Sequence, residues 1–303
     1  MYKPGYLNLL ANGELENIVK TLKEMLKDCV LCPHQCSVNR LNGEMGYCKT
    51  LDNCIVSGVQ PHFGEEEELV GSYGSGTIFF SHCNLSCVFC QNYETSHCGE
   101  GTSITIRQLA EMMLSLQRKG CHNINLVSPS HIVPQIVEAI FIAAKKGLNV
   151  PIIYNTGGYD LTDTLKLLNG IIDIYMPDIK FSDDDTALKY LRVKSYSTIA
   201  KNAVKEMHKQ VKDLKTDDRN IAYKGLLIRH LVLPQNLAGT EKIMHFIADE
   251  ISTNTYVNIM AQYYPAHRAY KFEELSRRIS REEYEIAINS AKMAGLKRYK
   301  SSI

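Results

Sequence analysis

The first patterned segment of the chain is helical. Between positions 14 and 27, apolar residues recur three or four residues apart, with charged residues between them. This spacing places the apolar side chains on one face and predicts an amphipathic helix over residues 14–27. Residues 29–54 then contain many cysteines and turn-forming residues but little periodicity. Such a segment needs a metal or a docking surface to become ordered.

From about residue 75, short β-rich apolar runs alternate with helical patterns. The predicted strands are residues 77–80, 124–127, 151–154, 171–176, 226–233 and 256–260. The predicted helices lie near 105–118, 132–146, 161–168, 197–213 and 240–251, with helical segments near 272–279 and 281–294 closing the chain. Six β/α repeats with almost continuously apolar strands indicate parallel strands covered by helices. An open doubly wound sheet and a complete or partial barrel both fit, and in both the chemistry gathers at the carboxyl ends of the strands.

Composition narrows the class of protein. The chain has 303 residues, of which 45% are hydrophobic, enough for one large α/β domain or two smaller ones. The net charge of +1 gives no broad basic field, so we expect no nucleic-acid partner. Residues 1–13 lack a signal pattern and no apolar run reaches about 18 residues, so we expect a cytoplasmic protein without a membrane segment. In that compartment, ten cysteines indicate metal ligands, redox groups or buried thiols rather than disulfides.

Three closely spaced cysteines follow the first predicted strand of the repeats. Cys83, Cys87 and Cys90 have the spacing C-x3-C-x2-C, so a compact loop can direct three thiolates at one cluster. A 4Fe–4S cluster with three protein ligands leaves one iron open to bind a substrate group. A structural zinc site would need a fourth ligand from His82, Cys98 or farther away. Unligated buried thiols are the remaining alternative.

At these residues the sequence resembles the radical SAM superfamily, and more closely its PflX-type branch, relatives of the pyruvate formate-lyase activating enzyme. The likeness runs from Cys29 to about Pro265 and rests on these stretches: GSGTIFFSHCNLSCVFCQNYETS (74–96), NINLVSPSH (123–131), PIIYNTGGYD (151–160), IIDIYMPDIKF (171–181), GLLIRHLVLP (225–234) and IMAQYYP (259–265). The resemblance implies an α/β fold, a partial (β/α)6 TIM-type barrel with a cysteine-rich N-terminal extension. We therefore expect an extension over residues 1–72, a barrel over 73–270 and a C-terminal helical segment over 271–303.

The resemblance also implies an enzymatic activity. The methionine amino and carboxylate groups of S-adenosylmethionine (SAM) would chelate the open iron on Cys83, Cys87 and Cys90. One electron would cleave SAM, and the resulting 5′-deoxyadenosyl radical would abstract hydrogen from an unknown substrate. The cofactor carries the difficult chemistry while the protein orients it. An electron donor such as ferredoxin or flavodoxin is the expected partner.

Further SAM contacts are carried over by position in the resemblance. They are Phe89, Ser128, Ser130, Asn155, Asp178, Lys180 and Arg229. Ser-Pro-Ser-His stands where activating enzymes have Gly-Gly-Glu, so the acidic residue of that motif is missing and hydroxyls or carbonyls would hold the SAM amino group.

The residues themselves support some of these assignments. Strand alternation places Asp178 and Lys180 on one face, to bind SAM or to form a structural ion pair. Arg229 interrupts an apolar strand and is not expected to be buried without a partner. Phe89 has core packing as its alternative role.

A second cysteine group lies near the N-terminus. Cys29, Cys32, Cys36 and Cys48 have the spacing C-x2-C-x3-C-x11-C, and Gly43 and Gly46 allow the chain to turn back toward them. Four thiolates fit one metal centre, either a structural zinc or a second iron–sulfur cluster. Reduced thiols packed against the barrel, or a role of these cysteines in redox chemistry, remain alternatives. The other cysteines, Cys54, Cys98 and Cys121, are expected to be ordinary buried thiols.

Three functions remain open. An activating enzyme would abstract hydrogen from a glycine of a partner protein. A second kind of radical SAM enzyme would act on a small molecule or a peptide natural product. A non-catalytic electron-transfer protein would cleave no SAM, but an open iron position serves no purpose in a pure electron carrier.

Overall fold

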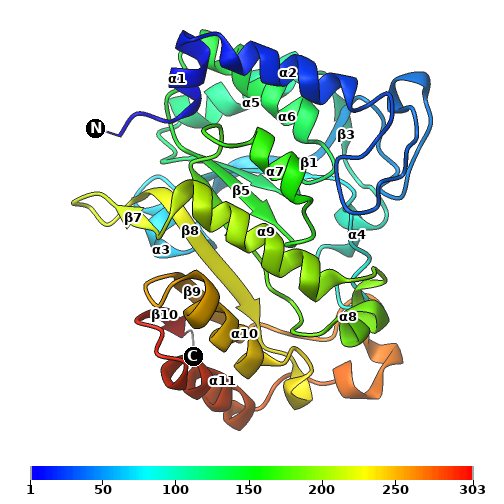
Figure 1. Ribbon diagram of the computed structural model, residues 1–303, viewed down its shortest axis with the longest axis vertical. Coiled ribbons are helices and arrows are strands. Elements are labelled where there is room, and N and C mark those ends of the chain that lie inside the picture. The colour runs from blue at the N-terminus through cyan, green and yellow to red at the C-terminus, as the bar shows by residue number, and fades with distance from the viewer. Residues whose placement is uncertain (1, 302–303) are drawn as a thin grey trace.

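A curved, largely parallel sheet forms the centre of the molecule in the computed structural model, which describes residues 2–301 (Figure 1). Strands β2 (Ser75–Phe80), β4 (Ile124–Val127), β5 (Ile152–Thr156), β6 (Ile174–Pro177), β8 (Ala222–Leu231), β9 (Tyr256–Met260) and β10 (Arg298–Ser301) pair in parallel in that order. The two end strands of the sheet do not pair with each other. The fold is thus a partial TIM-type barrel, and the sequence prediction of the fold class is confirmed.

Helices between the strands cover the outside of the sheet. They are α5 (Ile106–Arg118), α6 (Val133–Lys145), α7 (Thr162–Leu167), α8 (Asp184–Leu191), α9 (Tyr196–Val211), α10 (Thr240–Phe246) and α11 (Arg281–Met293). Reciprocal side-chain and backbone hydrogen bonds start α5 at Thr105 and Gln108, and α11 at Ser280 and Glu283. The apolar strands are buried beneath these helices, as expected of a parallel sheet.

The N-terminal part packs against this sheet rather than standing apart. Helix α2 (Glu14–Glu24) lies on α6, with α1 (Tyr6–Ala11) beside it (Figure 1). The Asp173 carboxylate anchors the start of the chain, because it accepts hydrogen bonds from the Tyr2 hydroxyl (2.7 Å) and the Gly5 amide (3.1 Å). Residues 25–53 consist of turns and one 3₁₀ turn, Arg40–Asn42.

Some elements differ from the sequence prediction. Strands β1 (Cys54–His62) and β3 (Thr102–Ile104) extend the sheet in antiparallel orientation beyond β2. Residues 272–279 contain only the 3₁₀ turn Glu273–Leu275, and α10 widens into a π turn over Ile247–Ile251. Short elements complete the chain: α3 (Glu67–Val70), α4 (Tyr93–Ser96), β7 (Lys215–Thr216) and the 3₁₀ turns Pro234–Asn236 and Ala269–Lys271.

The sheet also runs across both expected domain boundaries, since β1 precedes residue 73 and β10 follows residue 270. Within residues 2–301, no helix has the length and apolar character needed to cross a membrane.

Candidate metal and cofactor sites

A cavity of about 590 Å³ opens at the carboxyl ends of the parallel strands. Loops after β2, β4, β5 and β6 and the inner faces of β8 and β9 form its wall. Most of the site residues expected from the sequence line it, namely Cys83, Cys87, Phe89, Cys90, Ser128, Asn155, Asp178, Lys180 and Arg229. The volume lies in the range of about 300–1,000 Å³ that is usual for small-molecule sites.

Hydrogen bonds to two neighbouring segments hold the loop of residues 83–90, here called the triplet loop. The Ser86 and Val88 amides donate to the carbonyl oxygens of Leu191 (3.1 Å) and Tyr190 (2.9 Å). The Asn84 side chain donates to the Tyr159 carbonyl (2.6 Å). These bonds hold Cys83, Cys87 and Cys90 at one end of the cavity without using their sulfur atoms.

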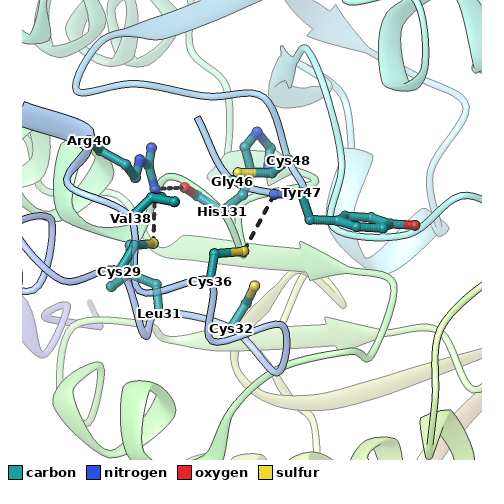
Figure 2. Close-up of a pocket in the computed structure, with 10 residues that line it drawn as sticks. All are labelled: Cys29, Leu31, Cys32, Cys36, Val38, Arg40, Gly46, Tyr47, Cys48 and His131. Carbon is teal, nitrogen blue, oxygen red and sulfur yellow. Dashed lines mark hydrogen bonds between the residues drawn. The ribbon is translucent and has the colours of Figure 1, made fainter. Parts of the chain in front are cut away.

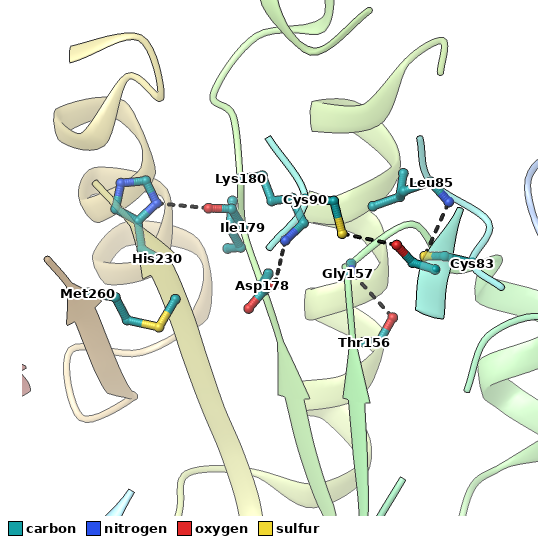
Figure 3. Close-up of polar contacts among 12 residues, drawn as sticks. Cys83, Leu85, Cys90, Thr156, Gly157, Asp178, Ile179, Lys180, His230 and Met260 are labelled. Atoms are coloured by element: carbon teal, nitrogen blue, oxygen red, sulfur yellow. Dashed lines mark hydrogen bonds and ion pairs between the residues drawn. The ribbon is translucent and has the colours of Figure 1, made fainter. Parts of the chain in front are cut away.

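The thiols of the triplet loop have only weak or replaceable partners. Cys83 Sγ accepts from the Leu85 amide at 3.4 Å, and Cys90 Sγ lies 3.0 Å from the Ser96 hydroxyl (Figure 3). Burial raises the pKa of Cys83 to about 11 and raises the pKa of Cys87 further, although Lys180 opposes both shifts. The Cys83 and Cys87 thiols are therefore protonated when nothing is bound. A soft metal centre would displace the protons, so this thiol set fits an iron–sulfur cluster.

Asp178 and Lys180 form an ion pair on the cavity wall. Lys180 Nζ lies 2.5 Å from Asp178 Oδ2, and the two side chains are 17% and 24% exposed. Burial alone would lower the pKa of Lys180, but Asp178 and then Cys87 outweigh it, and the pKa is raised. Lys180 is consequently a permanent cation next to the triplet loop, partly open to a ligand.

The turn after β5, which packs next to this ion pair, requires glycine. Gly158 has φ of +81°, and a Cβ there would collide with the Asp178 carbonyl oxygen. The Tyr196 hydroxyl donates to the Gly157 carbonyl (2.8 Å) and accepts from the Lys180 amide (3.1 Å). The turn after β5 is thereby tied to the segment after β6 that carries the ion pair.

The remaining expected SAM contacts divide into two groups. Ser128, with φ of +60°, and Asn155 lie at the cavity, as does Phe89, which also makes edge contacts with Phe181 and Tyr263. Ser130 lies behind the cavity wall instead. It is 4% exposed, and its hydroxyl is 3.0 Å from that of Thr156. The assignment of Ser130 as a direct contact therefore does not agree with its position.

Arg229 is already held by two carboxylates that the sequence interpretation did not identify. Its guanidinium bonds to Glu65 and Glu66, and Glu66 Oε1 also accepts from the Asn258 side chain (2.6 Å). Glu66 is buried, yet Arg229 keeps its pKa below the usual range. These groups form a charged floor to the cavity and place Arg229 in a structural network. An arginine inside an apolar strand indicates such a partner, and the acidic run at 65–68, which the sequence interpretation overlooked, supplies it.

The four N-terminal cysteines line a separate and much smaller cavity of about 10 Å³, together with Arg40 and His131 (Figure 2). Burial raises the pKa of Cys32 to about 12. Within residues 2–301, no set of three or more Cys, His, Asp or Glu side chains is arranged to hold a metal ion as it stands. An ion bound at these four thiols would therefore draw the sulfur atoms together. Of the other cysteines, Cys54 and Cys121 are buried as expected, but Cys98 is exposed, and that expectation was wrong.

Comparison with known proteins adds a family and a fold. A family model described as the radical SAM superfamily matches residues 77–247. Uncharacterized protein MJ0674 of Methanocaldococcus jannaschii is 32% identical over 289 residues, covering 92% of this chain and 78% of that protein. The crystal structure of HydG, a maturase of the FeFe-hydrogenase, aligns with a TM-score of 0.51 and 13% identity over 96% of this chain and 64% of HydG, which supports the fold alone. A structure of TYW1 with a lysine-pyruvate adduct bound gives a TM-score of 0.48 and 13% identity, covering 79% of this chain and 83% of TYW1.

Proposed function

This chain belongs to the radical SAM superfamily, and from that premise we propose that it abstracts a hydrogen atom from a peptide or protein substrate. Membership implies a 4Fe–4S cluster and S-adenosylmethionine. The cluster, when bound, supplies the electron that cleaves SAM into methionine and a 5′-deoxyadenosyl radical. The observation that carries the proposal is the position of Cys83, Cys87 and Cys90 at one end of a cavity of about 590 Å³, large enough for a nucleoside-sized ligand.

The roles of this chain's residues follow from their positions. Cys83, Cys87 and Cys90 would hold the cluster. Lys180 would pair with the SAM carboxylate, because it is a partly accessible cation beside the triplet loop, while Asp178 keeps it charged and positioned. Phe89 offers an apolar surface, and Ser128 and Asn155 offer hydrogen-bonding groups at the strand ends. Arg229 lines the floor of the cavity, where Glu65 and Glu66 hold its guanidinium.

The choice of substrate class rests on weaker support. The sequence stretches that resemble the PflX-type branch suggest a likeness to activating enzymes, and hence a peptide or protein target. A small polar molecule is the second candidate, because Arg229, Glu65, Glu66 and Asn258 give the cavity a charged floor. A one-electron donor such as ferredoxin or flavodoxin completes the proposed reaction.

The test is the formation of 5′-deoxyadenosine. The protein would be reconstituted anaerobically with iron and sulfide, reduced with dithionite, given SAM, and assayed by mass spectrometry. We expect product from the wild type and none from the Cys83/Cys87/Cys90→Ala variant. Addition of a glycine-containing peptide or a candidate small molecule made with deuterium at the target carbon would show which substrate transfers deuterium to the product. A fully loaded wild-type cluster that cleaves no SAM would favour the electron-transfer alternative.

A further inference from the structure

We propose that the cysteine-rich segment, residues 29–48, binds a second metal centre through Cys29, Cys32, Cys36 and Cys48, that Arg40 supplies the counter-charge, and that the filled segment supports the triplet loop. A single thiophilic ion such as zinc fits a cavity of about 10 Å³, whereas an iron–sulfur cluster would require the four cysteines to move apart. The metal site and its counter-charge stand apart from the proposed function. The support of the triplet loop rests on it.

The burial of the Arg40 guanidinium without a carboxylate partner in the described residues argues for an anionic occupant of this cavity. Arg40 is 1% exposed, and its guanidinium donates to the carbonyl oxygens of His131 (2.8 Å) and Leu51 (3.0 Å). Its one side-chain hydrogen-bond contact within residues 2–301 is Cys29 Sγ, at 3.9 Å (Figure 2). No ion pair joins Arg40 to a carboxylate within residues 2–301, whereas Arg229, the other arginine inside the fold, has two. A buried cation without an anion is unfavourable.

A four-thiolate centre resolves this charge imbalance. Four thiolates carry more negative charge than a divalent ion neutralises, so the filled site is anionic and lies next to the guanidinium. Without a metal, the cavity places a buried guanidinium beside cysteine side chains and no carboxylate from the part of the chain that the structure describes. The arrangement is therefore electrostatically complete only when the cysteines are ionised and bound to metal.

The backbone around the cavity fits sulfur ligands. The Tyr47 amide donates to Cys36 Sγ at 3.4 Å, and such donors favour thiolates. Gly46 lets the chain approach this closely, because a Cβ there would lie 2.8 Å from the same sulfur. The Cys29 amide and carbonyl bond to Val38 and Ser37, which closes the segment into a loop with all four cysteines on the cavity.

Two residues of this segment bind the triplet loop directly. His34, between Cys32 and Cys36, donates through Nε2 to the Asn84 carbonyl oxygen at 2.8 Å. Tyr47, next to Cys48, donates to the Ser86 hydroxyl at 2.7 Å and stacks on His34 with ring centres 3.7 Å apart. Asn84 directly follows Cys83, and Ser86 directly precedes Cys87. A metal that orders the N-terminal segment would therefore also stabilise the loop that carries Cys83 and Cys87, through these two hydrogen bonds.

Metal counting tests the site without SAM cleavage. The protein carrying Cys83/Cys87/Cys90→Ala would be prepared anaerobically and assayed for zinc, iron and sulfide per chain. We expect one metal centre to remain: zinc alone identifies a zinc site, and iron with sulfide identifies a cluster. Cys32→Ala together with Cys36→Ala, added to this protein, leaves only two of the four ligands and should remove the centre, while Cys54→Ala, a buried cysteine outside the cavity, should not. Absence of both metals from the triplet variant, or their persistence after the double Cys32→Ala/Cys36→Ala change, overturns the site.

A second pair of variants tests the counter-charge and the support. In the same triplet-free protein, Arg40→Lys should retain the metal, and Arg40→Met should weaken its retention against a chelator by about 10- to 100-fold. Equal retention by the two variants would refute the role of Arg40. With the triplet intact, Cys32→Ala should accelerate amide hydrogen exchange over residues 83–90 relative to Cys54→Ala. Unchanged exchange there would leave a metal site that does not support the triplet loop, and would contradict that part of the proposal.

Discussion

The two cysteine groups differ in the space and charge around them. Cys83, Cys87 and Cys90 lie at one end of a cavity of about 590 Å³, beside an ion pair that remains partly exposed. Cys29, Cys32, Cys36 and Cys48 surround a cavity of about 10 Å³, beside a buried arginine without a carboxylate partner in the described part of the chain. The first group leaves room for a ligand to enter, and the second leaves room for little more than metal. Cysteine spacing alone describes both as metal sites, but the surroundings suggest which one can react.

The largest expected effect concerns the charges inside the open cavity. Arg229→Met leaves Glu65 and Glu66 buried without a cation, so we expect a loss of about 3–5 kcal/mol in the free energy of unfolding. Urea denaturation of the metal-free, reduced protein would measure it. The exposed Arg219, paired with Asp217, provides the control, and Arg219→Met should cost less than about 1 kcal/mol. Similar losses in the two variants would show that the cavity floor is not a buried network.

Acid should weaken the wall of the same cavity. His230 is fully buried behind Arg229, with Ile179 and Thr240 as hydrogen-bond partners, and burial lowers its pKa to about 4 from an ordinary 6.5. Below pH 6.5, His230 binds a proton in the unfolded chain, but in the folded protein it stays neutral until the pH approaches its lowered pKa of about 4. The free energy of unfolding should therefore fall by roughly 3 kcal/mol between pH 6.5 and pH 4. In His230→Gln, this part of the pH dependence should disappear from urea titrations. An unchanged profile would assign the acid sensitivity to other groups.

The next prediction concerns the affinity of the open cavity for SAM. Lys180→Met removes the cation beside the triplet loop, and we expect SAM affinity to fall by about 10- to 100-fold, the equivalent of one charged hydrogen bond. Equilibrium dialysis with the reconstituted protein would measure the dissociation constant. Lys166→Met, which breaks an exposed pair with Asp163, is the matched control and should bind as the wild type does. Normal SAM binding by Lys180→Met would make the Asp178–Lys180 pair purely structural.

The smallest effect lies at the contact between the two regions. Tyr47→Phe removes one hydrogen bond to Ser86 and should lower the free energy of unfolding by about 1 kcal/mol. Tyr270, which is 68% exposed, supplies the control, since Tyr270→Phe should change nothing measurable. A Tyr47→Phe protein as stable as the control would mean that the hydroxyl contact contributes nothing.

Much of the fold could be predicted because its elements are locally patterned. The strands at 124–127 and 256–260 have their predicted bounds, and most helices match within a few residues. Helix α8 was missed although its N-cap, Asp183, is local, whereas the missed strands depend on distant partners. Strand β1 has no clear alternation and forms because β2 and β3 pair with it, and β10 exists because β9 offers an edge. The segment at 272–279 forms only a single 3₁₀ turn, and the Leu275 carbonyl oxygen accepts a hydrogen bond from the distant Tyr263 hydroxyl (2.7 Å).

The site was predictable only where residues adjacent in sequence act together. The triplet spacing and the Asp178–Lys180 pair are local, so the sequence contains them. The partners of Arg229 are more than 160 residues away, and the contacts of His34 and Tyr47 with the triplet loop also join separate segments. Ser130 was expected at the cavity because of its position after a strand, but its side chain turns toward Thr156, behind the cavity wall. Only the folded structure resolves such choices.

The most direct test of the central claim is electron paramagnetic resonance of the reduced, reconstituted protein with and without SAM. The account predicts that SAM changes the signal of a cluster that disappears with Cys83/Cys87/Cys90→Ala and persists in Cys32→Ala. A signal that responds to SAM in the absence of the triplet, or that is lost with Cys32→Ala while the triplet remains loaded, would contradict the assignment of the reactive site to the open cavity.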